Sequence, residues 1–168
     1  EGVEAVMKSR AVDLERGIRW LLDDPDGKGL ATKLYQHPLI YSLFPGPYQH
    51  VEKRVRGGNL AAYIPAPNFA LALLDMTARG TDLGPYAAQQ TSQALTIPTL
   101  RASVQRLPSP FVQRAVLSAI DNAQGDIARV QSNLEEWFNS AMDRVSGHYK
   151  RRTQLLLFLI GMGTTFAL

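Results

Sequence analysis

An all-α fold is predicted for this chain of 168 residues by three observations. Apolar residues recur at intervals of three and four in every long segment, which is the period of an amphipathic helix. Clusters of Pro and Gly separate these segments, as expected for turns between helices. The third observation is an uncharged apolar run at the C-terminus, directly after three basic residues. We therefore expect a helical domain over residues 1–149 and the start of a transmembrane helix, itself incomplete, over 150–168.

The first helix is predicted to end near Leu22, where the turn formers of 23–29 begin. A short helix is expected next over 30–36, and then a brief turn over 38–44 that Pro-Gly-Pro at 45–47 breaks. The apolar positions of the first helix have helical spacing: Val3, Val6, Leu14, Ile18, Leu21 and Leu22.

The helical pattern is lost from Tyr48 to Ile64, which predicts a mobile loop. A loop of this length in a compact domain is usually functional or disordered. Order returns at Pro65, where Pro residues in the first helical turn start an Ala- and Leu-rich helix that ends near Arg79-Gly80.

The C-terminal half is expected to hold three further helices. One covers about 97–107, and the next covers 111–123 after the N-cap pair Ser109-Pro110. Gly125-Asp126 then begins the longest helix. Its apolar residues keep helical spacing: Ile127, Val130, Leu134, Trp137, Phe138, Ala141, Met142, Val145 and Tyr149. Unbroken to the last residue, it would be about 64 Å long, with Gly147 as its one soft position.

The predicted membrane entry consists of Tyr149, Lys150, Arg151 and Arg152. The uncharged residues 155–168 after it give about 21 Å of helix, less than the roughly 30 Å of a bilayer core, so we expect a truncated span. Basic residues collect on the cytoplasmic side of a span, which predicts a cytoplasmic domain before it. The alternative is a buried C-terminal helix in a domain without a membrane span.

Two further expectations concern the ends of the chain. Glu1 is not an initiator Met and no signal-peptide pattern opens the sequence, so we expect a segment before it. Gly161 and Thr165 lie four residues apart in the predicted span, and small residues at this spacing let two membrane helices pack closely.

The charge of the chain is modest, with 18 basic and 15 acidic residues and a net charge of +3. This balance argues against a nucleic-acid partner, which would need a denser basic stripe. Anionic lipid headgroups would explain two basic clusters near the ends, and solvated helix faces would explain the first equally well. These clusters are Lys8, Arg10, Arg16 and Arg19, and Arg144, Lys150, Arg151 and Arg152.

The sequence predicts no catalytic residue, no metal site and no cofactor. The chain has no Cys, and its three His residues have no partner at the spacing of metal-binding helices; His37 and His50 are expected to be surface or capping groups. Nucleotide-binding and hydrolase motifs are not found. Glu135 and Glu136 are neighbours on a helix, where they cannot face one substrate, and are expected to face solvent.

The acidic run Asp23-Asp24-Pro25-Asp26-Gly27 is similar in composition to a calcium loop. With Gly27 at the sixth position, however, Leu22 and Lys33 would take the first and twelfth positions, which need carboxylates. A solvated turn at a helix end is the better interpretation.

Four stretches together resemble a family of uncharacterised bacterial inner-membrane proteins. They are 13–24, 35–40, 63–75 and above all the motif of 137–154, which ends in Ser-Gly-His-Tyr-Lys-Arg-Arg-Thr-Gln. The motif departs from the family at His148, where Trp is expected. The resemblance implies an N-terminal hydrophobic segment, a cytoplasmic helical domain and several C-terminal spans, and it implies no activity.

Two function classes follow. The first is a membrane-tethered interaction or scaffold domain with no enzymatic activity, whose partners are lipids, other membrane helices or protein subunits. The second is the cytoplasmic regulatory part of a channel or transporter, in which the last helix couples the domain to the spans. An enzyme acting on lipid is a distant third.

Overall fold

The computed structural model describes residues 2–44, 60–81 and 94–145, with side chains from residue 7 onward. These ranges are helical and contain no strand, which confirms the predicted all-α class. Most of the loop predicted over 48–64 and the predicted span over 150–168 lie outside them. None of the described helices is both long enough and apolar enough to cross a membrane.

The N-terminal helices begin and end close to the predicted residues. Helix α1 covers Gly2–Leu21, α2 covers Leu30–Gln36 and α3 covers Pro38–Tyr41. The end of α1 is set by Asp23, which has a φ of 55° and thus the left-handed conformation that Asp tolerates better than most residues. The reversal that follows lets α2 pack beside α1.

Helix α4, Ala66–Arg79, is the centre of the fold. It packs against α2, α3, α6 and the short 3-10 helix η1. Eight of its side chains are buried: Phe69, Ala70, Ala72, Leu73, Leu74, Met76, Thr77 and Ala78. Gly80 ends the helix with a φ of 93°, as the Arg79-Gly80 pair predicts.

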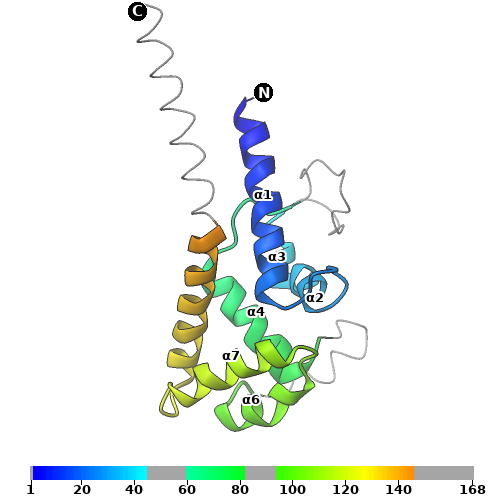
Figure 1. Ribbon diagram of the computed structural model, residues 1–168. Helices are drawn as coiled ribbons and strands as arrows, with labels where there is room; N and C mark the ends of the chain where they lie inside the picture. Colours follow the sequence, from blue (N-terminus) through cyan, green and yellow to red (C-terminus); the bar gives the residue numbers. More distant parts are fainter. Residues whose placement is uncertain (1, 45–59, 82–93, 146–168) are drawn as a thin grey trace, which may run out of the picture.

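The remaining helices form the lower part of the molecule in Figure 1. Helix α6 covers Ile97–Ser103, η1 covers Val104–Arg106 and α7 covers Pro110–Asp121. The Ser109 hydroxyl accepts a hydrogen bond from Val112 N at 3.2 Å, which confirms the predicted N-cap. Gly125, with a φ of 88°, then turns the chain into a helix over 127–145, called here the C-terminal helix.

The C-terminal helix is fixed to α4 by aromatic packing. The ring of Phe138 stacks on that of Phe69, with centroids 4.3 Å apart, and Trp137 lies at 6.2 Å from the same ring. Phe69 is fully buried. The described part of this helix buries Val130, Leu134 and Phe138 in the core, and its predicted continuation beyond residue 145 lies outside the described residues.

One part of the predicted 48–64 loop belongs to the core instead. Leu60, Ala61 and Ile64 are buried, with 1–8% of their surface exposed. Leu60, Ala61 and Ile64 have helical spacing, but three positions are too few to establish a period, so the sequence pattern did not reveal them.

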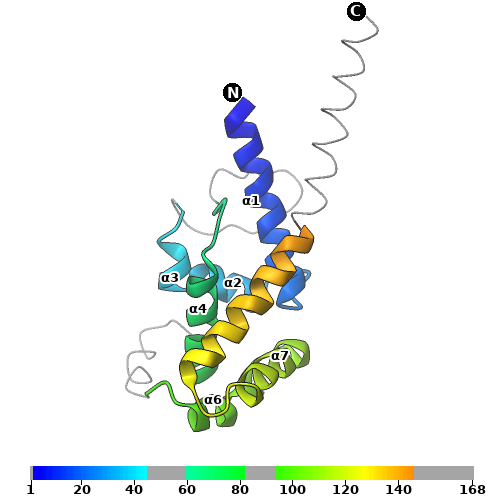
Figure 2. The same cartoon turned by 90° about the vertical axis from the view of Figure 1, so that its left-hand side faces the viewer.

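The start of α1 and the end of the described C-terminal helix lie on the same side of the molecule. Figure 1 and Figure 2 both show the start of α1 and the end of the C-terminal helix on the side of the molecule opposite α6. The two helices meet at Gly17. A Cβ atom added to this glycine would lie 2.8 Å from Cγ2 of Val145 and 3.3 Å from Cε of Met142.

Gly17→Leu should therefore destabilise the domain by about 1–3 kcal/mol, the usual cost of overpacking, in thermal or urea unfolding. Without a neighbouring helix, the same replacement would stabilise α1 by up to about 1 kcal/mol because Gly is a poor helix former. Val145→Ala in the same chain should restore part of the loss. A stabilised Gly17→Leu variant would show that the two helices do not pack here.

Candidate functional site

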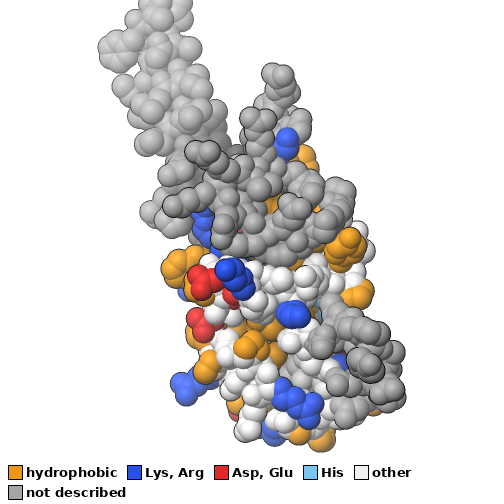
Figure 3. All heavy atoms as spheres, turned by 90° about the vertical axis from the view of Figure 1, so that its right-hand side faces the viewer, with side chains coloured by type: hydrophobic (Ala, Val, Ile, Leu, Met, Phe, Trp, Pro, Cys, Tyr) orange, Lys and Arg blue, Asp and Glu red, His pale blue; other side chains and the backbone are white. Residues whose placement is uncertain are grey.

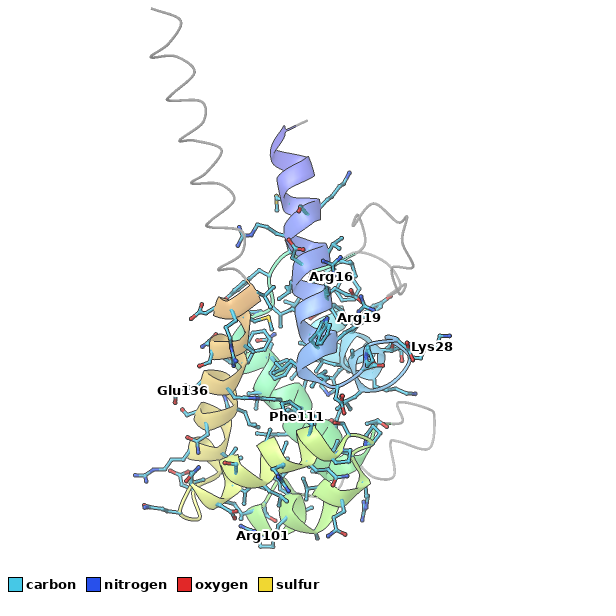
Figure 4. The ribbon with its side chains drawn as sticks, in the orientation of Figure 1. Arg16, Arg19, Lys28, Arg101, Phe111 and Glu136 are labelled. Atoms are coloured by element: carbon cyan, nitrogen blue, oxygen red, sulfur yellow. The ribbon has the colours of Figure 1, made fainter. Side chains whose placement is uncertain are left out.

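The basic residues predicted to form a cluster on α1 have different surroundings in the structure. The Arg19 guanidinium lies 3.0 Å from the carboxylate of Glu15, which is fully buried, and donates to the carbonyl of Pro25 at 2.8 Å. Arg19 therefore interacts within the fold, whereas the sequence left both anionic lipid headgroups and a solvated helix face open for it. Arg16 is exposed, 3.7 Å from Asp13, and Figure 4 shows both arginines on α1.

The acidic turn is also structural. Asp24 is buried, and its carboxylate accepts backbone hydrogen bonds from Lys28, Gly29 and Ala31 at 2.9–3.1 Å. These donors close the turn and cap the start of α2. The prediction of a solvated turn is thus wrong for Asp24, because its side chain is buried. Its carboxylate oxygens accept hydrogen bonds from backbone amides and are not directed at a cation.

His37 is buried and belongs to a polar cluster between α3 and α4. Its Nδ1 accepts from Leu39 N at 3.3 Å and its Nε2 lies 3.2 Å from Asp75, which also pairs with Arg79. The predicted capping role is confirmed, whereas the surface position is wrong. A His-Asp pair is typical of general bases, but here the second ring nitrogen is occupied by the backbone and cannot take a proton from a substrate.

Metal and acid-base chemistry are therefore not supported by the polar clusters. Within 2–44, 60–81 and 94–145, no three His, Asp or Glu side chains are placed to hold a metal ion. Glu135 accepts a hydrogen bond from Gln131 at 2.7 Å, and Glu136 is exposed, as predicted for solvent-facing charge. His50 and His148 lie outside the described residues.

Two surface grooves follow the C-terminal helix, and they are the best candidates for a binding site. The first has a volume of about 510 Å³ and lies between this helix, α1 and the segment 60–65. Its lining is mostly apolar with three charged residues: Arg10, Asp13, Leu14, Ala62, Tyr63, Ile64, Phe138, Asn139, Met142, Asp143 and Val145. Tyr63 is 69% exposed at its edge. We call it the upper groove.

The second groove, the lower groove, has a volume of about 530 Å³ and separates the C-terminal helix from α7. The two helices diverge from the turn at 122–126, as Figure 2 shows, and Asn133 bridges them there by donating to Ala119 O at 3.0 Å. One wall is mostly small residues: Ala115, Ser118 and Ala119. Two aromatic residues, Phe111 and Trp137, also line the groove.

Phe111 is the exceptional residue of the lower groove, since 57% of its surface is exposed. It follows the Ser109-Pro110 cap, so its backbone is held in the first turn of α7. Figure 4 shows Phe111 on α7 and Glu136 on the C-terminal helix. From the sequence, Phe111 is only the first residue of a predicted helix, because a single apolar residue carries no signal of its own exposure.

The residues predicted to meet the membrane are not among those that the structure describes. Tyr149, Lys150, Arg151 and Arg152, together with Gly161 and Thr165 of the predicted span, lie outside the described residues. Their roles stay predictions.

No protein-family model, curated protein or solved structure matches the chain. The resemblance to bacterial inner-membrane proteins therefore stays a prediction that rests on the sequence motifs alone.

Proposed function

We propose that the chain is a membrane-tethered helical interaction domain on the cytoplasmic side of a bacterial inner membrane. The observation that carries this proposal is the position of two helix ends. The start of α1 and the end of the described C-terminal helix lie on the same side of the molecule, and the two helices meet at Gly17 (Figure 1). With the basic residues 150–152 and the apolar residues 155–168 following that helix, this end of the domain would face the bilayer.

The arrangement of the surfaces supports an interaction role over an enzymatic one. Buried polar side chains such as Asp24 and His37 accept hydrogen bonds from backbone amides of the domain itself. The lower groove, with its exposed Phe, instead offers a surface for docking. It lies next to α7, on the side of the molecule away from the proposed membrane face.

A second candidate is a regulatory part of a channel or transporter. The close contact of Gly17 with Val145 favours it, because a displacement of α1 would be passed directly to the C-terminal helix. Gly17→Leu should then change transport of the intact assembly, whereas a scaffold would lose only stability.

Replacement of Lys150, Arg151 and Arg152 together by Glu tests the tether. Cytoplasmic basic residues set the orientation of a span, so the variant should leave the membrane fraction or reverse its orientation. Reporter fusions before Asp126 and alkaline extraction of membranes measure both outcomes. The matched control is Lys28→Glu with Arg16→Glu, since these exposed cations lie on the domain itself (Figure 4). A wild-type fusion that reports an external location would refute the proposed orientation.

A further inference from the structure

We propose that the lower groove is the surface through which two copies of this chain associate. The proposal deepens the proposed function and rests on it, because it names the partner that the interaction domain would bind. It starts from Phe111, whose side chain is exposed beside a groove that has room for a side chain of this kind. Exposed aromatic residues on the edge of a groove are typical anchors of interfaces.

The shape of the groove fits a helix. Its walls carry residues at helical spacing, with Phe111, Ala115 and Ser118 on α7 and Asn133, Trp137 and Ser140 on the C-terminal helix. The small side chains among them allow a second helix to approach closely, and the ring of Trp137 provides an apolar surface. Helices that dock in grooves use this pattern of anchors three and four residues apart.

The charges favour a second copy as the occupant. Arg114 lies one turn after Phe111 on α7, and Glu136 lies beside Trp137 on the opposite wall. Both are exposed, and within the described part of the chain neither makes an ion pair or side-chain hydrogen bond. The groove thus has one cation and one anion on opposite walls. In a two-fold dimer each contact occurs twice, so Arg114 of each copy can meet Glu136 of the other.

In Figure 3, the apolar side chains that can be seen lie in small groups separated by polar and charged ones. The lower groove instead combines an aromatic anchor, small walls and self-complementary charges. The groove is small, about 530 Å³, so we expect a weak dimer in solution that the membrane stabilises by raising the local concentration of tethered copies.

Charge reversal in the full-length chain tests this assignment. Arg114→Glu and Glu136→Arg, made singly, should each weaken association about tenfold in mild detergent, by light scattering or sedimentation. The double variant should restore it, because both ion pairs are rebuilt with opposite polarity. Phe111→Ala should weaken association about tenfold as well. Tyr63→Ala, an exposed aromatic in the upper groove, and Lys28→Glu are the matched controls and should have no effect.

Cysteine cross-linking in membranes provides a second measurement, and the chain is suited to it because it contains no Cys. Copies with Arg114→Cys and copies with Glu136→Cys, expressed together, should form a mixed disulfide, whereas Lys28→Cys with Glu136→Cys should not. A double charge reversal that stays monomeric would overturn the proposal in favour of a different protein partner. Equal cross-linking of both pairs would overturn it too.

These outcomes are separable from failure of the tether. If the cross-link is missing while the protein stays in the membrane fraction, only the dimer is wrong. If the protein leaves the membrane fraction but still forms the mixed disulfide in solution, only the tether is wrong.

Discussion

Phe69→Ala is expected to destabilise the domain by about 3–5 kcal/mol, the usual cost of truncating a buried Phe. Phe69 is fully buried at the point where α4 meets the C-terminal helix, and its ring stacks on Phe138 at 4.3 Å. The substitution would leave a cavity between the two helices, and it would remove the contact with Trp137. Urea unfolding followed by helical circular dichroism measures the loss.

Leu71→Ala is the matched control for this variant, because Leu71 lies on the same helix with 37% of its surface exposed. It should cost about 1 kcal/mol or less. Equal losses for the two variants would mean that the C-terminal helix is not anchored on α4 through Phe69, and would contradict the fold described above.

Asp24→Ala is the second large effect, with an expected loss of about 2–4 kcal/mol. The buried carboxylate accepts three backbone hydrogen bonds, and hydrogen bonds to a charged group contribute about 1.5–3 kcal/mol each, although they do not add fully. Their loss leaves buried amides of the turn and of α2 without an acceptor. Thermal unfolding should show a lower Tm, and exchange of the Ala31 amide should become faster.

Asp26→Ala provides the control, because Asp26 is in the same turn and is exposed. It should change the free energy of unfolding by less than about 0.5 kcal/mol. If Asp26→Ala is as damaging as Asp24→Ala, the net charge of the turn would matter more than the hydrogen bonds of one carboxylate.

Much of the fold could be predicted from local signals in the sequence. Helix α2 and the N-cap Ser109 are placed by Gly, Pro and Ser residues whose backbone preferences act within a few positions. The central position of α4 also follows from its wide apolar surface. These features depend on neighbours along the chain, which the sequence displays directly.

The polar clusters and the grooves could not be predicted in the same way. Asp24 and Asp26 have the same side chain in one turn, and only the folded backbone decides which carboxylate meets three amides. Asp75 reaches His37 across 38 positions of sequence. The lower groove depends on how α7 and the C-terminal helix pack against each other. Asn133 joins the two helices by a hydrogen bond to Ala119 O, and no periodicity in the sequence reveals this contact.

Depth measurement in a bilayer tests which end of the domain faces the membrane. Met7 is exposed on α1, about 15 Å beyond the contact at Gly17, whereas Arg101 is exposed at the opposite end of the molecule (Figure 4). Met7→Cys and Arg101→Cys variants of the full-length chain, each carrying a nitroxide label, would be reconstituted in bilayers that contain a lipid-bound relaxation agent. We expect strong relaxation at position 7 and little at position 101. Equal relaxation at both positions, or stronger relaxation at position 101, would contradict the proposed orientation.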